Sequence, residues 1–421
     1  MSQTERKADI AVIGGGASGM AAAVFAAESG CRTVILEHRD APGKKIPATG
    51  NGRCNFTNTL LGTEYYRGEQ PEFVSDALSR FGAHDAVSFF RRLGVWSTER
   101  NGYCYPRNMQ AATIRSALLA ELGRRKVPVR CGIQILSIKK EKDGFRIRTD
   151  SGSWKVKCCI LATGGCADPK TGSDGSGYIF AQRFGHELIP PVPALVPLTS
   201  DAGWLKAVKG VRAKGRVRIN VNNVPLASDC GEIQLTDYGI SGIPVFQVSR
   251  YASRALSRGQ RVSADLDFIP EAGEKALIRW LTNRLFSEEA PSSLEEILAG
   301  VLPGKLAAEI TRLLHAGNID LLTLSSDQKK EFAERTVKQL KRTRIAVTGT
   351  KGFEQAQVTA GGISTSEINS MTMESVLVKG LYFCGEILDI DGICGGYNLQ
   401  WAWSSAYCAG KAAAGRCLGR K

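Results

Sequence analysis

The strongest constraint on this chain is a glycine pattern near its N-terminus. Gly14, Gly16 and Gly19 form G-x-G-x-x-G after the apolar run "ADIAVI" and open a helical pattern over 17–29. A second apolar run, "RTVILE", ends in the acidic residue Glu37. A strand, a glycine turn, a helix, a second strand and a terminal acid in this order are typical of a β-α-β unit that binds a dinucleotide.

Each part of the pattern has a mechanical reason. Gly14 permits a tight turn, Gly16 lets the backbone approach a pyrophosphate, and Gly19 lets the helix pack closely on the strand. The helix N-terminus offers free N–H groups and the positive end of its dipole to phosphates. Glu37 stands where a carboxylate can accept hydrogen bonds from ribose hydroxyls. A glycine-rich turn without a ligand is the alternative interpretation.

The segment 41–58, "APGKKIPATGNGRCNFTN", distinguishes between NAD and FAD as the dinucleotide. It is longer and richer in glycine than an ordinary connection, so its backbone amides can wrap around an extended cofactor. Lys44, Lys45 and Arg53 supply positive charge. These features favour FAD, and a mobile surface loop is the alternative.

Composition limits which cellular compartment and which binding partners we expect for the chain. The apolar stretch 8–27 imitates a signal peptide, but three consecutive glycines interrupt it, so we expect a cytoplasmic protein without a membrane segment. Twelve cysteines without a C-x-x-C pair predict free thiols and no metal site. The net charge is +14, yet no zinc finger or aromatic-basic platform accompanies the basic runs. This favours a solvated basic face, or an anionic substrate, over nucleic-acid binding.

The chain as a whole predicts an α/β protein in which a second domain interrupts the first. Residues 1–191 form the first part of a Rossmann-type domain, with a buried strand in "KVKCCILATGG". The proline-rich segment 188–200 marks the crossing to an insert at 192–344, read as β-strands with a helical cap. Residues 345–421 return to the first domain, with a short buried strand at 381–384.

The returning segment supplies a second group of candidate residues. Gly385 and Glu386 follow the short strand, and open α/β sheets bind ligands at the carboxyl ends of their strands. Gly396 can bring the backbone close to a cofactor, and Asn398 can help cap a helix that begins near Leu399. The nearby Trp401 and Trp403 are interpreted as packing residues of that helix.

Six motifs in this order resemble the BaiN/YhiN-type flavoproteins, a family also called aminoacetone-oxidase-like in some members. The motifs are "AVIGGGASGMAAA", "GNGRCNFTN", "ATGGCADPKTGSDGSGY", "LTDYGISG", "VTAGGIS" and "GLYFCGEILDIDGICGGYNLQWAWSS". The resemblance covers essentially the whole chain. It implies a Rossmann-type FAD-binding domain, of the two-dinucleotide flavoprotein type, interrupted by an insert domain.

The resemblance also assigns residues to FAD. It places Gly14, Gly15, Gly16, Ala17, Ser18 and Gly19 at the phosphates, Glu37 and His38 at the adenosine ribose, Lys44, Lys45, Asn51, Gly52, Arg53 and Asn55 in the flavin-proximal loop, Ile133 at the adenine, Thr163 and Gly164 on the pyrophosphate side, and Gly385, Glu386, Gly396, Asn398 and Leu399 at the ribityl and flavin end. One departure stands out. Similar proteins often carry G-x-x-F-P where this chain reads "NGYCYP" at 101–106, a segment that can face substrate or simply pack.

The residues limit the chemistry that a bound FAD would perform. No second G-x-G-x-x-G is present for a resident nicotinamide, so NADH is expected to visit transiently. Cys54 stands alone in "GRCN", which disfavours disulfide-reductase chemistry. The family resemblance implies reduction of conjugated double bonds in a 3-oxo-delta4,6 bile-acid intermediate, an anionic or CoA-linked steroid.

Such a reduction needs a proton donor and a group that polarises the carbonyl. Tyr238, Tyr103, Tyr105 and Tyr397 are candidates, and packing is the alternative for each. Three other functions stay open: an amine oxidase that uses oxygen, an RNA-modifying flavoenzyme, and a redox sensor that holds flavin without turnover.

Overall fold

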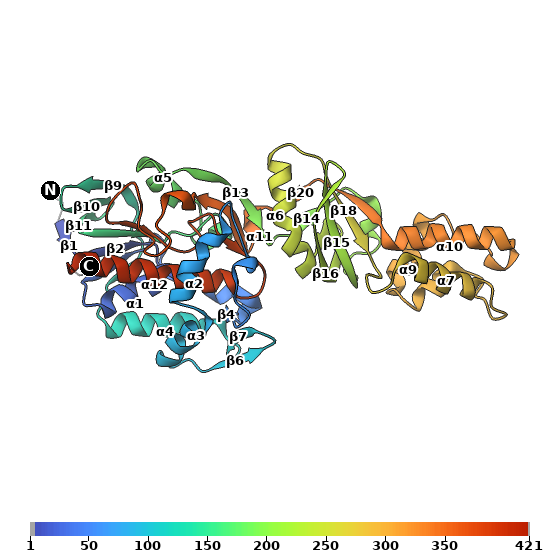
Figure 1. Cartoon of the computed structure of the whole chain (residues 1–421), viewed down its shortest axis with the longest axis horizontal. Coiled ribbons are helices and arrows are strands. Elements are labelled where there is room, and N and C mark those ends of the chain that lie inside the picture. The colour runs from blue at the N-terminus through green and yellow to red at the C-terminus, as the bar shows by residue number, and fades with distance from the viewer. Residues whose placement is uncertain (1–4, 420–421) are drawn as a thin grey trace. The chain divides into compact units, whose positions relative to one another are not determined.

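The computed structural model describes residues 5–419, which divide into two compact units (Figure 1). Unit 1 combines the residues up to Val192 with those from Gln357 onward, and unit 2 is the continuous segment Pro193–Ala356. The sequence places the second border near 344. In the structure, β19 (Thr343–Val347) and β20 (Gly349–Thr350) lie beyond or across that point, because they form the two edges of the sheet of unit 2.

Unit 1 is built on a five-stranded sheet. Its order is β22 (Leu381–Phe383), β12 (Cys158–Leu161), β2 (Ile10–Ile13), β3 (Thr33–Leu36) and β8 (Val129–Arg130). Every neighbouring pair runs parallel. Strands buried on both faces read as continuous apolar runs, which is why the sequence reveals the inner ones so clearly. The strand expected at 381–384 is present as β22, and it pairs with β12.

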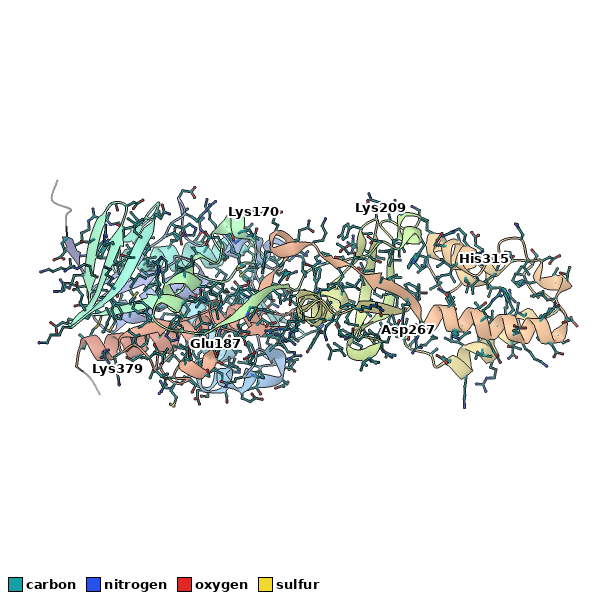
Figure 2. All side chains as sticks on the ribbon, turned by 90° about the horizontal axis from the view of Figure 1, so that it is seen from above. Lys170, Glu187, Lys209, Asp267, His315 and Lys379 are labelled. Atoms are coloured by element: carbon teal, nitrogen blue, oxygen red, sulfur yellow. The ribbon has the colours of Figure 1, made fainter. Side chains whose placement is uncertain are left out.

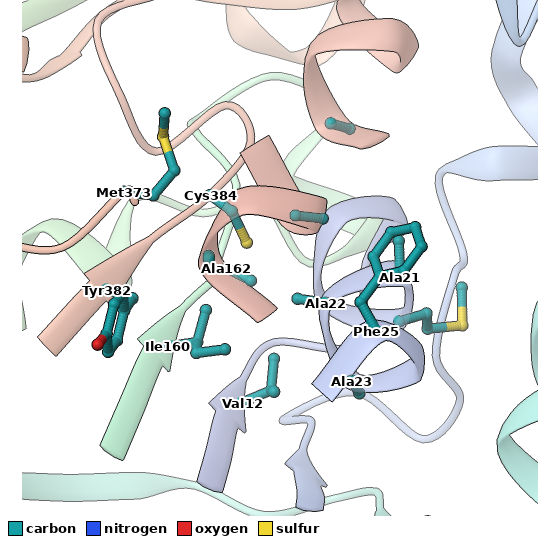
Figure 3. Close-up of a cluster of buried hydrophobic side chains, with 14 of the residues drawn as sticks. Val12, Ala21, Ala22, Ala23, Phe25, Ile160, Ala162, Met373, Tyr382 and Cys384 are labelled. Carbon is teal, nitrogen blue, oxygen red and sulfur yellow. The ribbon is translucent and has the colours of Figure 1, made fainter. Parts of the chain in front are cut away.

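Two helices from opposite ends of the chain pack together in unit 1. They are α1 (Ala17–Glu28) and α12 (Tyr397–Cys417). A Cβ atom on Gly410 would lie 2.6 Å from the carbonyl oxygen of Ala22, so the helix backbones approach closely. Figure 3 shows Ala22 facing the side chains of Val12 and Ile160, which stand on neighbouring strands. The small residues of α1 therefore serve close packing on both sides of the helix.

Smaller elements complete unit 1. A four-stranded sheet has the order β1 (Glu5–Lys7), β11 (Gly152–Val156), β10 (Gly144–Thr149), β9 (Ile135–Glu141), and a three-stranded sheet has the order β4 (Thr57–Asn58), β7 (Tyr103–Pro106), β6 (Ser97–Arg100). Two further pairs join β5 (Tyr66–Arg67) to β23 (Asp391–Gly392) and β13 (Leu188–Ala194) to β21 (Val358–Ile363). The remaining helices are α2 (Val74–Arg80), α3 (Ala83–Arg92), α4 (Ala111–Arg124) and α5 (Ser176–Arg183).

Unit 2 contains a seven-stranded antiparallel sheet. Its order is β19, β18 (Val262–Asp267), β15 (Arg212–Val221), β16 (Val224–Thr236), β17 (Gly239–Ser241), β14 (Leu198–Thr199) and β20. Asn222 and Asn223 adopt φ of 49° and 68° and close a two-residue hairpin. The apolar and polar residues that alternate on either side of this pair therefore belong to two strands. The helix α6 (Ile243–Ser257) covers one face of the sheet and was missed by the sequence analysis.

The rest of unit 2 is helical. It comprises α7 (Glu274–Leu285), α8 (Leu294–Ala299), α9 (Gly304–Leu313), α10 (Ser326–Lys341) and the short α11 (Gly352–Gln355), which agrees with the helical cap expected for the insert. Asp267, marked in Figure 2, ends β18 and pairs with Lys341 at the end of α10, with Nζ 2.7 Å from Oδ2. This ion pair joins the sheet to the helices. Among the described residues, every helix is too short or too polar to span a bilayer.

The two tryptophans of α12 lie in the core, as predicted. Trp401 and Trp403 are 1% and 0% exposed. We expect Trp403→Ala to lower the free energy of unfolding by about 3–5 kcal/mol, because it empties a packed site and orphans the carbonyl of Phe56, which accepts from Nε1 at 2.8 Å. Trp96, 63% exposed in the same unit, is the control: Trp96→Ala should cost less than about 1 kcal/mol. If denaturant titrations gave the two variants equal losses of unfolding free energy, the core position of Trp403 would be contradicted.

Candidate cofactor site

The predicted site residues gather at one edge of the parallel sheet. The residues that follow the strand ends are Gly14 after β2, Glu37 after β3, Ile133 after β8, Thr163 after β12 and Gly385 after β22. Because the five strands are parallel, their carboxyl ends meet at the same edge. The fold thus brings together candidates separated by more than half of the chain.

The N-terminus of α1 has the features of a phosphate site. Gly14 has φ +99°, and a Cβ atom there would lie 2.5 Å from the carbonyl oxygen of Ala162. Gly16 is the N-cap, and a Cβ atom there would meet nothing within 4 Å. No side chain caps the helix and its first turn contains no acid. The first-turn N–H groups of an α-helix have no intrahelical acceptor, so these amides are left for an anion.

Glu37 is held in place by backbone amides. Gly15 N donates to Oε2 at 2.6 Å, and Arg39 N donates to Oε1 at 2.7 Å. A carboxylate can accept about four hydrogen bonds, so lone pairs remain for ribose hydroxyls. The His38 ring lies beside it, with Nδ1 3.3 Å from Oε1. The amide of Ile133 donates to the Glu37 carbonyl at 2.9 Å, which places Ile133 beside the predicted ribose site.

A buried hydroxyl lies at the end of β12. Thr163 Oγ1 is buried and has no hydrogen-bond partner among the described residues. Gly164, next in sequence, has φ +73° and turns the backbone at this point. An unpaired buried polar atom is unfavourable unless a water or ligand satisfies it. A Cβ atom on Gly177 would collide with this hydroxyl, so the side chain of Thr163 faces the start of α5, and only the backbone of Thr163 and Gly164 lies on the predicted pyrophosphate side.

Two segments far apart in sequence meet at an ion pair. Lys45 Nζ lies 3.1 Å from Glu386 Oε2, and both side chains are largely buried. The second oxygen, Oε1, accepts from the backbone N–H of Thr359 at 2.7 Å. Lys44 instead pairs with Asp40 at the surface. Thr359 was not among the predicted residues, although it lies in the quoted motif "VTAGGIS".

The flavin-proximal loop adopts an unusual backbone. Asn51 and Gly52 have φ of 53° and 82°, and Cys54 has φ 57°. Arg53 is exposed between them. Asn55 Oδ1 accepts from the amide of Cys104 at 3.1 Å and so fixes the end of the loop against β7. The amides of Arg53 and Cys54 donate to the carbonyls of Gly50 and Thr49 at 3.1 and 3.0 Å, so hydrogen bonds within the loop hold this backbone.

The N-terminus of α12 lies against the same loop. Gly396 is the N-cap with φ +94°, and a Cβ atom there would lie 2.8 Å from the carbonyl oxygen of Thr57. The predicted cap is wrong: the helix begins at Tyr397, two residues before Leu399, and Asn398 does not cap it. The side chain of Asn398 instead accepts from the amide of Gly392 and donates to its carbonyl, both at 2.8 Å. Its short amide therefore fixes the preceding loop.

The predicted helix-packing residues also shape the site. Trp401 Nε1 donates to the carbonyl of Gly385 at 3.1 Å, and Gly385 N donates to Ser405 Oγ at 2.9 Å. A Cβ atom on Gly385 would collide with Ser18, in the first turn of α1. The hydroxyl of Ser18 donates to the carbonyl of Cys384 at 3.3 Å, away from the helix axis. Ala17 and Gly19 complete that turn.

The tyrosine candidates have different environments. Tyr397 donates its hydroxyl to the carbonyl of Leu60 at 2.9 Å and stacks on Tyr65, and burial raises its pKa, so its role is structural. Tyr238 belongs to unit 2, where Lys351 Nζ lies 4.8 Å from its ring centroid. Tyr103 lies on β7 with an exposed ring.

Taken together, these residues fit a dinucleotide. The open space at Gly16 and the uncapped first turn of α1 suit the pyrophosphate, and Glu37 suits the ribose. The loop at 51–55 and the N-terminus of α12 would then hold the flavin end.

The space at Gly16 provides a direct test of this fit. We expect Gly16→Ala to leave the melting temperature of the flavin-free protein unchanged, because its Cβ would meet no protein atom. The same methyl group would occupy the path of the pyrophosphate and lower FAD affinity by about tenfold or more. The matched control is Gly123→Ala in α4, where a Cβ atom also meets nothing. If Gly16→Ala left the FAD affinity unchanged, the pyrophosphate could not bind at the N-terminus of α1.

Cys54 lies in the flavin-proximal loop but is chemically inert. Its side chain is buried, and burial raises the pKa of its thiol to about 12. Since a raised thiol pKa suppresses the thiolate below that pH, on the order of one Cys54 in ten thousand is ionised at pH 8. We expect iodoacetamide to label the exposed Cys230 first and Cys54 last, with Cys54 labelling rising as the pH approaches 12. Peptide mass spectrometry measures both, and equal rates at pH 8 would refute the inert assignment.

Known proteins resemble the chain along nearly its whole length. It is 43% identical to a 3-dehydro-bile acid delta(4,6)-reductase of Clostridium scindens, over 97% of this chain and 99% of the relative. It is 31% identical to a ribosomal RNA dihydrouridine synthase of Escherichia coli, over 95% of this chain and 96% of the relative. A flavocytochrome c3 fumarate reductase structure superimposes with a TM-score of 0.50 at 14% identity, covering 98% of this chain and 79% of that one, and shows the shared fold.

A family model settles the assignment. The model for the HI0933-like protein Rossmann domain matches residues 8–412, which include both halves of the site. The α/β architecture and the gathering of the candidate residues at one sheet edge agree with that match. The chain belongs to the HI0933-like family of Rossmann-type flavoproteins.

Proposed function

We propose that the protein is an FAD-dependent oxidoreductase that takes hydride from NADH and reduces a C=C bond of a conjugated cyclic enone. The preferred substrate is a 3-oxo-delta4,6 bile-acid intermediate, an anionic or CoA-linked steroid. The observation that carries this proposal is the 43% identity to the bile-acid reductase over nearly the full length of both chains. The dihydrouridine synthase relatives are less similar, at 31% identity.

The site described above suits this chemistry. Bound FAD supplies hydride transfer between a reduced nicotinamide and the substrate double bond. The chain would hold the cofactor: α1 neutralises the phosphates, Glu37 fixes the ribose, and the N-terminus of α12 directs its dipole toward negative charge at the flavin end. The tie between Lys45 and Glu386 fixes the loop to the sheet edge. With Cys54 buried and un-ionised, no thiol partner is required.

An anaerobic experiment tests the proposal. NADH should bleach the absorbance of the bound flavin, and a steroid 4,6-dien-3-one should then restore it with loss of the dienone chromophore. NADPH in place of NADH defines the nicotinamide preference. A flavin that NADH leaves oxidised would contradict the proposed cycle. Bleaching by an amino ketone without NADH, followed by reoxidation with oxygen, would instead support the amine-oxidase alternative.

The second candidate is an RNA-modifying flavoenzyme, and a basic strand in unit 2 favours it. Along β15, Arg212, Lys214, Arg216 and Arg218 alternate with buried residues. The opposite face of the sheet is covered by α6, since a Cβ atom on Gly231 would lie 3.2 Å from Pro244. Glu232 of β16 lies 2.9 Å from Arg212 on this face, and β18 places Asp267 and Asp265 opposite Arg216 and Arg218, so carboxylates balance part of the row. A row of cations on one sheet face is suited to a phosphate backbone.

Charge reversal on this strand decides whether RNA is a partner. If the second candidate holds, Lys214→Glu with Arg218→Glu should weaken RNA binding by about tenfold or more and flatten its salt dependence. The control is Lys275→Glu with Lys330→Glu, which changes charge by the same amount on the helices of unit 2. Fluorescence anisotropy with a uridine-containing ribosomal hairpin measures both. Absence of binding by the unmodified protein at low ionic strength would eliminate this candidate.

A further inference from the structure

The strand β7 presents two tyrosines on one face. Along Tyr103–Pro106, the burial pattern alternates: Cys104 and Pro106 are buried, while Tyr103 is 39% exposed and Tyr105 is half-buried. Successive side chains of a strand point to opposite faces, so the two tyrosine rings share one face at a spacing of roughly 7 Å. Their pairing with β4, which joins Thr57 to Cys104, holds this register.

That face lies beside both segments that would hold the flavin end of the cofactor. A Cβ atom on Gly395, just before α12, would lie 3.3 Å from Tyr103 Cε1. A Cβ atom on Gly50, in the flavin-proximal loop, would lie 4.0 Å from Tyr105 Cε1. Asn58 reinforces the first approach by donating from Nδ2 to the carbonyl of Gly395 at 2.9 Å. The two rings therefore lie alongside the segments that the N- and C-terminal parts of the chain contribute.

The hydrogen bonding of their hydroxyl groups distinguishes these two tyrosines from the neighbouring ones. Tyr66 donates to the carbonyl of Tyr397 at 3.1 Å, and Tyr397 donates to the carbonyl of Leu60, so both are fixed in the fold. Across the described residues, the hydroxyls of Tyr103 and Tyr105 make no hydrogen bond to the protein. Burial raises the pKa of Tyr105, with Arg53 and Arg100 acting in the opposite direction, so the group stays a proton-bearing donor at neutral pH.

A purely structural role fits these features poorly. A side chain that serves packing is buried, as Cys104 between the two tyrosines is, at 2% exposed. Tyrosine combines a flat apolar face with a polar tip, which makes it suited to a site where one side contacts a ring and the tip meets a polar group. Two such rings in a row on one strand face form a flat aromatic surface with two free donors.

Resting on the proposed function, we propose that Tyr103 and Tyr105 form a substrate wall at the flavin end of the site. Their rings contact the flat ring system of the enone, and the Tyr105 hydroxyl donates a hydrogen bond to a polar group of the substrate. They act as specificity-determining residues. The segment "NGYCYP" would thereby set which ring system this chain accepts.

The two half-reactions of the holoenzyme test this wall separately. In Tyr103→Ala and Tyr105→Ala we expect unchanged FAD content and an unchanged rate of flavin reduction by NADH. The KM for the steroid dienone should rise about tenfold or more, because the ring contact is lost. Tyr105→Phe keeps the ring, so it should retain affinity for a steroid that lacks the polar group while losing several-fold in KM for one that carries it.

The controls keep failure of the wall distinct from failure of the proposed function. Trp96→Ala, which removes another exposed aromatic ring of unit 1, should leave every parameter unchanged. If the alanine variants lose FAD, Tyr103→Phe and Tyr105→Phe carry the test through their substrate preference. Wild-type enzyme whose reduced flavin the dienone does not reoxidise overturns the proposed function. Wild-type turnover with unchanged KM and unchanged substrate preference in all four tyrosine variants overturns the wall alone.

Discussion

The parallel pairing of β22 with β12 is the interaction on which the site depends. It aligns Leu381 with Cys159 and places the carboxyl end of β22 at the edge where β2, β3 and β12 also end. Without this pairing, Gly385 and Glu386 would have no fixed relation to the glycine turn after β2. The strand is only three residues long, so burial of its side chains, all at or below 1% exposure, must stabilise it.

Glu386 extends this constraint to the loops. One carboxylate oxygen pairs with Lys45 and the other accepts from the amide of Thr359, so a single side chain joins three segments. Such a pair is partly shielded from solvent, where charge-assisted hydrogen bonds are stronger than at the surface. Residues that stand more than three hundred positions later in the sequence therefore orient the flavin-proximal loop. Its unusual backbone at Asn51 and Gly52 is stable in that setting.

Much of unit 1 could be predicted from sequence, because its signals are local. A buried parallel strand is a continuous apolar run, and Gly14, Gly16 and Gly19 stand in a spacing that few other structures require. The ends of these strands and helices could be placed where the apolar runs stop. The pairing of β22 with β12, which joins the N-terminal and C-terminal parts of unit 1, is contained in no local pattern.

The errors have physical reasons as well. Asn398 was expected to cap a helix because Asn is a good N-cap, but its amide is better satisfied by both backbone groups of Gly392, and Gly396 takes the cap. The helix α6 was missed because prolines and β-branched residues near its start resemble a strand. Thr359 could not be identified, since its amide donates to Glu386 and its hydroxyl accepts from the amides of Cys166 and Ala167, partners that only the fold brings to it.

The division into two units has a consequence for how the protein is made. The ribosome completes the whole of unit 2 before it synthesises β22 and α12, the last pieces of unit 1. Until then, the alanine-rich surface of α1 that receives Gly410 has no partner, and β12 has an open edge. Unit 2 is continuous in sequence and can close its own core first, so the nascent chain carries a finished insert within an unfinished host. A chain truncated at Ala356 would lack both β22 and α12 and would leave that host permanently open.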